Sequence, residues 1–276
     1  MRIFHYVSES RRQELAFILK ALGDYGVGVI VVGIWPQDHL LTYYNGDLDG
    51  RVEDIRLEWS PEELEQVLLQ GSEALNLTMT PGLRAALVED AYGNVGLLQR
   101  LAEQVCIAEN IGSRCDRSRA LDVGLSLDSA REVVAESMNQ RFEAFADGFV
   151  RGMKRMTEGL EVYKHLLRTF THADDADLLS GIDSKELLTR INSDEEKIRQ
   201  SDLTQGLERI DRLQVKIEVQ PIVLAYSRSR RRIYLADRAF LFFRKYGKPT
   251  WPWDEDETFR SSIDAMPEQE PLDLDL

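Results

Sequence analysis

The residues best suited to bind a charged ligand are arginines gathered in one short stretch. Residues 221–226 and 232–237 predict the two strands of a hairpin, and the basic stretch forms its tip. The arginines of this stretch are Arg228, Arg230, Arg231 and Arg232. A guanidinium group binds phosphate oxygens through a planar fork of N–H donors, so the tip is suited to a nucleic-acid backbone. A solvated tip, or a tip that contacts another protein, fits the same residues.

Three predicted helices precede this hairpin. They cover residues 158–170, 183–188 and 201–213. Three helices followed by a β-hairpin is the order of a winged helix, whose third helix enters a DNA groove. Here that helix offers Arg209 and Arg212, together with Thr204 and Gln205, as contacts to DNA. These residue types form no recognisable base code, so no sequence specificity is predicted.

The charge of the chain is unevenly distributed around the hairpin. The formal net charge is −14, which by itself argues against nucleic acid and for solubility. Tyr226 to Lys248, however, contains eight basic residues and one acidic residue, a net charge of +7. Asp254 to Leu276 contains nine acidic residues and one arginine, a net charge of −8. We expect this acidic tail to compete with DNA phosphates for the basic patch.

Metal, disulfide and membrane chemistry find little support in the sequence. The four histidines do not cluster, and the two cysteines have no metal-binding spacing, so no metal site is predicted. The longest apolar stretch, Val27 to Trp35, is too short to cross a bilayer. A cytoplasmic protein without a membrane partner is the expectation. Trp251-Pro252-Trp253 either docks a partner or covers the edge of a core.

The elements of the N-terminal half are predicted from apolar spacing. Leu15 to Leu22 indicates a helix, and the β-branched run Val27 to Val32 indicates a strand buried on both faces of a parallel sheet. Three helices follow, beginning at Ser60-Pro61, at Thr80-Pro81 and at Asn94. Residues 112–124 are polar and predict a linker, and residues 126–156 predict one or two long helices, with Gly148 as a possible break. Val215, Ile217 and Val219 alternate with polar residues and predict another strand.

Four short segments in this half resemble AAA+ or STAND P-loop ATPases. Phe4-His5-Tyr6-Val7 resembles the end of a Walker B strand, and Val29-Ile-Val-Val-Gly33 resembles a sensor 1 strand. Asp47-Leu-Asp-Gly-Arg51 stands where an arginine finger is usually found, before a predicted strand from Val52 to Trp59. Gly93-Asn94-Val-Gly-Leu-Leu98 resembles the sensor 2 helix of the lid. The resemblance covers residues 1 to 111 and is strongest to TnsC/TniB-like and Cdc6/Orc-like ATPases.

The resemblance implies roles for four residues. Arg51 would act as an arginine finger on a neighbouring subunit, and Gly93, Asn94 and Arg100 would approach the nucleotide. Arg51 also fits a solvated loop arginine paired with nearby acids, and Gly93-Asn94 also fits a turn with a helix cap. The family uses ATP and Mg²⁺. This chain contains no Gly-x-x-x-x-Gly-Lys-[Ser/Thr] loop and has Arg2 and Ile3 in place of the Walker B acids, so it is not expected to bind or hydrolyse ATP alone.

Two functions follow from these patterns. The first is the C-terminal part of an ATP-dependent switch or assembly factor that acts on DNA or in mobile-element or defence systems. The second is a non-enzymatic winged-helix regulator that binds DNA or oligomerises, with protein partners or a second copy. The expected fold is mostly α with an α/β remnant, namely a truncated P-loop NTPase sheet, a helical lid and a C-terminal winged helix. The predicted units are residues 1–59 (remnant core), 60–111 (lid), 112–158 (helical connector), 159–250 (winged helix) and 251–276 (acidic tail).

Overall fold

The computed structural model of the protein describes residues 9–33, 40–55, 57–151, 159–193, 198–228 and 230–254. Most of these residues are helical, and the described strands form two small sheets. The expectation of a mostly helical protein is therefore confirmed. The predicted strand around residues 4–7, with His5, lies outside the described residues, as do His39 and residues 255–276 of the acidic tail.

Residues 9–55 form a small N-terminal unit with its own core. Helix α1 (Glu9–Asp24) packs on helix α2 (Leu40–Tyr44) and on the 3-10 helix η2 (Gly46–Leu48). The buried side chains between them are Ala16, Leu41 and Leu48. This core is small, so we expect burial of apolar area to stabilise the unit only weakly.

The two strands predicted in this part of the chain are not formed. Residues 27–33 and the described residues of 52–59 belong to no helix or strand. Ile30 is 92% exposed and Leu57 is 90% exposed. The prediction of a strand buried on both faces is wrong, because a parallel strand needs hydrogen-bonded neighbours and the described chain supplies none here.

Three helices follow, and their starts agree with the sequence. They are α3 (Pro61–Leu75), α4 (Pro81–Asp90) and α5 (Val95–Ala108). Ser60 Oγ accepts a hydrogen bond from Glu63 N at 3.2 Å, and the Glu63 carboxylate accepts one from Ser60 N at 2.8 Å. This capping box satisfies two backbone donors at the start of α3. Thr80 and Asn94 cap α4 and α5 in the same way, each through one side-chain acceptor.

The predicted linker at residues 112–124 is anchored by hydrogen bonds rather than loose. Within it, strand β2 (Arg119–Leu121) pairs in parallel with β1 (Leu77–Met79). Asn76 Nδ2 donates to the carbonyl of Cys115 at 2.8 Å, and Cys115 N donates to the carbonyl of Leu75 at 2.9 Å. Both partners lie about 40 positions earlier in the chain, which is why local composition did not reveal them.

Helix α6 (Leu125–Arg151) is a single helix of 27 residues that continues through Gly148. A side chain at Gly148 would meet Ile217 at 3.2 Å, so this glycine permits close packing and does not break the helix. Phe142 of α6 lies 5.3 Å from Phe240 and 4.9 Å from Phe243 of helix α11 (Ala239–Tyr246). Phe149 contacts Tyr163, so an aromatic row on α6 joins it to two other helices.

The C-terminal unit combines five helices with a three-stranded sheet. Its elements before α11 are α7 (Gly159–His172), α8 (Asp175–Ser180), β3 (Ile182–Asp183), α9 (Ser184–Ile191), α10 (Gln200–Lys216), β4 (Leu224–Ser227) and β5 (Arg232–Leu235). The strand order is β3-β5-β4, and both pairings are antiparallel. The predicted strand at 215–219 is wrong, because α10 continues to Lys216 and Glu218 adopts a positive φ of 58°.

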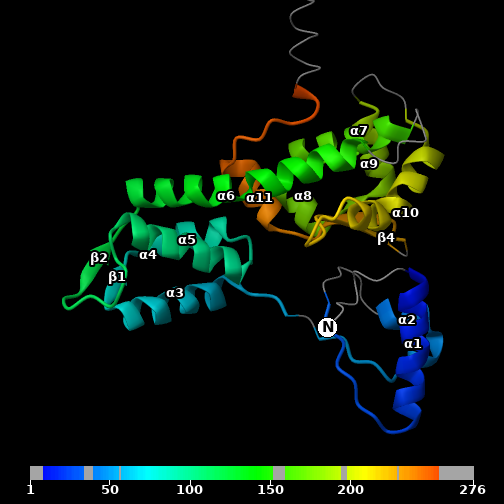
Figure 1. Ribbon diagram of the computed structural model, residues 1–276, viewed down its shortest axis with the longest axis horizontal. Coiled ribbons are helices and arrows are strands. Elements are labelled where there is room, and N and C mark those ends of the chain that lie inside the picture. The colour runs from blue at the N-terminus through cyan, green and yellow to red at the C-terminus, as the bar shows by residue number, and fades with distance from the viewer. Residues whose placement is uncertain are drawn as a thin grey trace, which may run out of the picture.

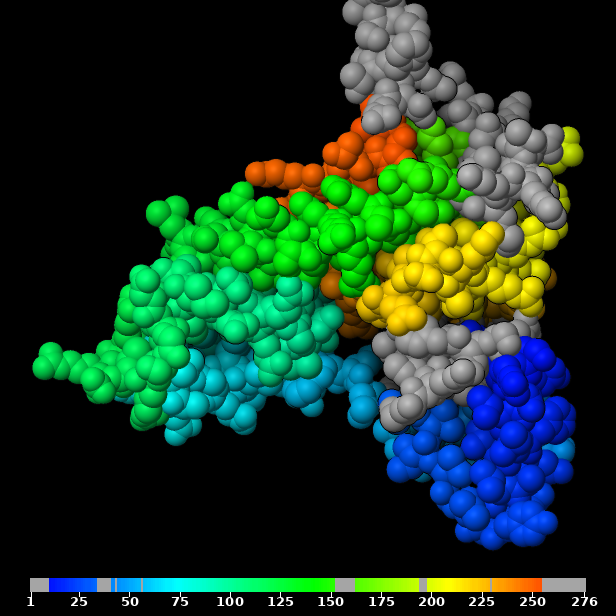
Figure 2. Space-filling model, in the orientation of Figure 1, coloured from blue at the N-terminus to red at the C-terminus, as the bar shows by residue number. Residues whose placement is uncertain are grey.

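The elements from α3 to α11 share one continuous hydrophobic core. Figure 1 shows α6 lying across the molecule, with α3 to α5 beneath one end and the C-terminal unit around the other. In Figure 2 the N-terminal unit projects from the rest as a separate lobe. Trp253 is buried and stacks on Trp251 at 5.4 Å between ring centroids, and Trp251 contacts Phe240 and Phe243. The two tryptophans therefore cover the edge of the core.

Candidate nucleic-acid interface

The basic hairpin is formed as the sequence predicts. Strands β4 and β5 pair from Leu224↔Leu235 to Ser227↔Arg232, which leaves residues 228–231 as the connecting loop. Ser227 is buried, and its hydroxyl accepts a hydrogen bond from Arg230 N at 3.3 Å. This bond closes the loop. Arg228, Arg230 and Arg231 are exposed at its tip.

Arg232 differs from the other three arginines. Its Nη1 donates to the carbonyls of Gly181 at 3.0 Å and of Ser180 at 3.4 Å. Arg232 also pairs with Asp183 in the register of β5 and β3. This side chain therefore holds the turn between α8 and β3, while its neighbours face solvent at the tip.

Gln214 fastens the hairpin to α10, a contact that the sequence did not indicate. Its side chain is fully buried. Gln214 Oε1 accepts from Val223 N at 2.8 Å and from Leu224 N at 2.9 Å, and its Nε2 donates to the Leu224 carbonyl at 2.7 Å. One amide thus satisfies three backbone groups at the start of β4. Because these groups are buried, the bonds fix the hairpin relative to the helix.

One face of α10 is buried in the core, and the residues predicted to contact DNA lie outside that face. The inward side chains include Leu203, Leu207, Ile210 and Leu213. Arg212 and Gln205 are exposed, whereas Arg209 and Thr204 are half-buried. Thr204 Oγ1 donates to the carbonyl of Gln200 at 2.8 Å. The polar face of α10 is thus open at Gln205 and Arg212.

The N-terminal unit approaches α10. Arg12 of α1 lies 3.7 Å from the carboxylate of Asp211, and its side chain is largely buried. Arg12 Nη1 also lies 3.3 Å from the hydroxyl of Tyr44. A guanidinium group of α1 therefore bridges the N-terminal unit and the helix that carries Arg209 and Arg212.

A groove of about 1400 Å³ separates the N-terminal unit from the hairpin. One wall consists of residues 27–33 and of 51–55, 57 and 58. The other wall includes Arg230, Arg232, Tyr234 and Arg238. The first wall is apolar along residues 27–32 but also carries Glu53, Asp54 and Glu58. The second wall combines its arginines with Leu179, Leu235 and Ala236, so both walls are mixed in character.

Arg51 lies in this groove and pairs with a carboxylate. Its Nη1 is 2.5 Å from Asp24 Oδ1, and about half of the side chain is exposed. The hydrogen bond to Arg51 holds the pKa of the Asp24 carboxyl below its usual value. The sequence proposed a pairing with acids near Arg51, and the partner observed is Asp24, which is 27 residues away.

The remaining nucleotide-related residues have structural partners. Gly93 adopts a positive φ of 76°, and a side chain there would collide with Arg238 at 2.6 Å. Asn94 Oδ1 accepts from Leu97 N at 3.1 Å as the cap of α5. Arg100 Nη2 donates to Ser137 Oγ of α6 at 2.6 Å. The turn and cap at Gly93-Asn94 are thus as the simpler interpretation predicted, and Arg100 joins α5 to α6.

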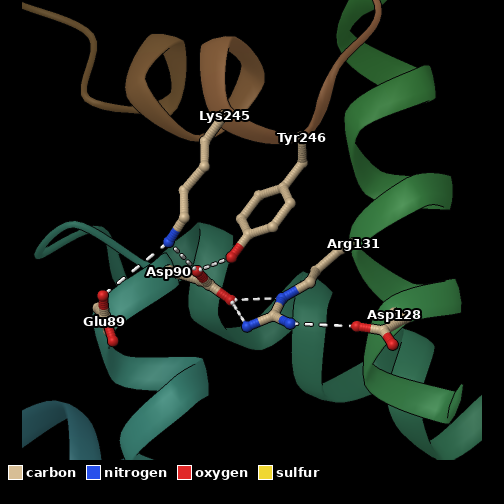
Figure 3. Close-up of polar contacts among 6 residues, drawn as sticks. All are labelled: Glu89, Asp90, Asp128, Arg131, Lys245 and Tyr246. Atoms are coloured by element: carbon tan, nitrogen blue, oxygen red, sulfur yellow. Dashed lines mark hydrogen bonds and ion pairs between the residues drawn. The ribbon is translucent and has the colours of Figure 1, made fainter. Parts of the chain in front are cut away.

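A buried charged cluster lies apart from the hairpin, around Asp90 (Figure 3). The Asp90 side chain is 1% exposed. It accepts from Arg131 Nε at 2.8 Å, from Lys245 Nζ at 3.2 Å and from the Tyr246 hydroxyl at 2.5 Å. Arg131 also lies 3.2 Å from Asp128. These residues come from α4, α6 and α11, so the cluster connects three helices.

Burial and hydrogen bonding act together on the ionisable groups of this cluster. The pKa of the Tyr246 phenol is raised, first because burial disfavours the phenolate and then because the hydroxyl donates to Asp90. Burial acts to lower the pKa of Arg131, but the hydrogen bond and attraction to Asp90 raise it overall. Three donors thus compensate the Asp90 charge, as a buried carboxylate requires.

Metal-binding clusters and membrane-spanning helices are both absent from the part of the chain that the structure describes. There, no group of three or more histidine, cysteine, aspartate or glutamate side chains is arranged to hold a metal ion. None of the described helices is long and apolar enough to span a bilayer. His165 is buried in α7, and His172 Nδ1 lies 2.8 Å from the Arg168 carbonyl.

Comparison with models of known families, with characterised proteins and with solved structures gives no match for this chain. The geometry of the hairpin, α10 and the groove is therefore the basis on which a function can be inferred.

Proposed function

We propose that the protein is a non-enzymatic DNA-binding regulator whose residues 159–250 act as a winged helix. The observation that carries this proposal is the topology of the C-terminal unit. The order is α7, α8, β3, α9, α10, β4 and β5, in which the short helix α8 stands between α7 and β3, and the short strand β3 pairs with β5. This order supports the proposal, because a winged helix uses a helix followed by a hairpin to present a recognition helix and a wing.

The charges of the unit favour nucleic acid as its ligand. The tip of the proposed wing exposes Arg228, Arg230 and Arg231, and α10 exposes Arg212. Gln214 fixes the hairpin to the helix, so these side chains are held on one rigid support. Rigid placement lowers the entropic cost of contacting several phosphates at once. The contacts are to the backbone, so the binding is expected to be independent of base sequence.

The alternative, an ATP-dependent switch, gains less support from the geometry. Arg51 pairs with Asp24, Asn94 caps α5 and Arg100 bonds Ser137. The segments expected to form the strands of a nucleotide-binding sheet are unpaired within the described chain. We therefore base the proposal on the hairpin and α10 and assign no ATPase step to these residues.

The test is fluorescence anisotropy with a labelled DNA duplex across a salt series. The triple variant Arg228→Gln, Arg230→Gln, Arg231→Gln is expected to bind at least about tenfold more weakly at about 50 mM salt, because each phosphate contact releases counterions. The slope of log affinity against log salt should become shallower by about one for each phosphate that the variant no longer neutralises. Glutamine keeps much of each side-chain stem, so the change removes charge with little effect on packing.

A matched control uses three arginines at the opposite end of the molecule. The triple variant Arg114→Gln, Arg117→Gln, Arg119→Gln removes the same charge from an exposed stretch that ends at the first residue of β2. This control variant should bind DNA with nearly the affinity of the unmodified protein and with nearly the same slope of log affinity against log salt. Equal weakening in both variants would show that only net charge matters, and unchanged binding by the hairpin variant would contradict the proposed wing.

A further inference from the structure

The N-terminal unit lies against the two elements that form the proposed DNA-binding surface. Arg12 of α1 pairs with Asp211 of α10 at 3.7 Å, and Asp211 directly precedes the exposed Arg212. The groove beside this unit has Arg230 of the hairpin tip in its other wall. Figure 1 shows α1 and α2 directly below α10 and β4. The N-terminal unit therefore faces both the recognition helix and the wing.

A DNA duplex requires the same space. A recognition helix enters a major groove about 12 Å wide, so the DNA backbones pass along both flanks of the helix. Successive residues of a helix are about 100° apart, which places Asp211 on a flank of α10 next to the polar face that carries Arg212. The contact with Arg12 puts the N-terminal unit on that flank.

The arginines of the wing remain accessible to water in this arrangement. Arg212 and Arg230 are both exposed, because the space between the two units is an open groove of about 1400 Å³. A duplex, however, must contact the helix and the wing at the same time. The N-terminal unit thus obstructs a duplex without burying the side chains that would bind it.

The attachment of the N-terminal unit favours reversible movement. Its core of Ala16, Leu41 and Leu48 is separate from the main core. The described residues of 52–59, which connect the two cores, form no helix or strand. Asp211 is 41% exposed, and a partly exposed ion pair stabilises a contact only modestly. A small change in this contact can therefore shift the position of the unit.

We propose that the N-terminal unit covers the winged helix in a closed state and that the pair Arg12–Asp211 holds it there. This inference rests on the proposed function, because it concerns access of DNA to α10 and the hairpin. DNA binds the open state, in which the unit has moved away from α10. The apparent affinity is then reduced by the fraction of open molecules, so weakening the pair strengthens DNA binding.

Charge reversal at Arg12 tests the proposal, because the expected result is opposite to the effect of net charge. Arg12→Glu makes the protein more negative, which by itself weakens DNA binding. It also sets a carboxylate against Asp211 and opens the surface, so the affinity for a labelled duplex should rise at least about threefold. Fluorescence anisotropy at about 150 mM salt measures this change.

The matched control is Arg11→Glu, which changes the charge equally at the neighbouring position of α1. Arg11 is exposed and pairs with Glu14 of its own helix. This control should bind DNA no more tightly than the unmodified protein. Unchanged or weaker binding by Arg12→Glu, or equal tightening by Arg11→Glu, would overturn the proposal.

A second substitution should reverse the effect. Adding Asp211→Arg to Arg12→Glu exchanges the two charges and restores the original net charge. The affinity should fall back towards that of the unmodified protein, although the second change places a cation on α10. A further rise in affinity would show that charge alone governs binding, which contradicts a closed state held by this pair.

A cross-link tests the contact without DNA and without breaking it. In Arg12→Lys, a water-soluble carbodiimide can condense the new ammonium group with the Asp211 carboxylate to an amide, and the reagent takes up the water released. Mass spectrometry of the digested protein identifies the link. The linked protein should bind DNA at least about tenfold more weakly than Arg11→Lys treated in the same way, because it cannot open.

The outcomes separate this inference from the proposed function. Absence of a link between positions 12 and 211 would overturn the closed contact, whatever the DNA affinity. A linked protein that binds DNA as well as the treated control would overturn the cover and leave the winged helix standing. If neither the unmodified protein nor Arg12→Glu binds DNA, the proposed function fails and the cover fails with it.

Discussion

At the scale of single residues, Asp90 shows how a buried charge is made compatible with a core. Its carboxylate lies among apolar helices, and Arg131, Lys245 and Tyr246 each donate to it. Among the described residues, removing Asp90 leaves Arg131 with only the exposed Asp128 and Lys245 with only the exposed Glu89 as acidic partners. The surface pair Lys248–Glu132 also bridges to α6 but is largely exposed on both sides, so water can replace its contact.

Replacing Asp90 therefore tests whether this cluster stabilises the fold. Asp90→Ala should lower the free energy of unfolding by about 3 kcal/mol, because Arg131 and Lys245 are then left without a buried partner. Glu132→Ala is the matched control and should change it by less than about 1 kcal/mol. Urea denaturation followed by circular dichroism gives both values. Similar values for the two variants would mean that Asp90 contributes no more than a surface ion pair.

At the scale of secondary-structure elements, the hairpin depends on α10. The sheet β3-β5-β4 is small, and β3 contributes only two residues. Gln214 adds hydrogen bonds beyond those of the sheet, since its amide binds the backbone of Val223 and Leu224 directly. This polar side chain on the neighbouring helix therefore helps to fix the hairpin, together with the pairing of β5 with β3.

Replacing Gln214 should loosen the hairpin before it unfolds the protein. Gln214→Leu keeps a side chain of similar volume but leaves the buried backbone groups of Val223 and Leu224 without partners. We expect this loss to lower the free energy of unfolding by about 3 kcal/mol. Gln205→Leu, on the exposed face of the same helix, should cost less than about 0.5 kcal/mol. Hydrogen exchange at Val223 and Leu224 should accelerate selectively in the first variant. Unchanged exchange there would contradict the proposed support.

At the scale of the whole molecule, the chain has two hydrophobic cores of unequal size. The larger core extends from α3 to α11, and the smaller one contains Ala16, Leu41 and Leu48. The described residues of 52–59 connect them without regular structure, and Leu57 is almost fully exposed. Residues 112–124, by contrast, are held by β2 and by the bonds of Cys115.

Limited proteolysis should reflect this difference. A protease specific for glutamate should cut at Glu58 at least about tenfold faster than at Glu109, because local opening near Glu58 breaks fewer buried contacts. Mass spectrometry of the early fragments measures both rates. The sequence predicted a linker at residues 112–124. Cutting at Glu109, just before this segment, as fast as at Glu58 would show that β1 and β2 do not hold it.

The sequence by itself determined the features that depend on local interactions. Ser60, Thr80, Asn94 and Asp183 cap helices where predicted, because a cap bonds backbone groups two or three residues away. The hairpin also followed from two apolar runs on either side of a basic, polar loop. The exposed arginines at its tip were therefore identifiable as candidate site residues, whereas Arg232 required the structure, since its partners lie some 50 positions earlier.

Tertiary structure decided everything that needs a distant partner. Val27 to Val32 has the composition of a buried strand, yet strand formation requires a second strand to accept and donate hydrogen bonds. The described chain offers none, so the segment stays exposed and lines a groove. Asp90 and Gln214 look ordinary in the sequence. Their roles arise because folding buries them beside residues from other elements, where an uncompensated polar group would be costly.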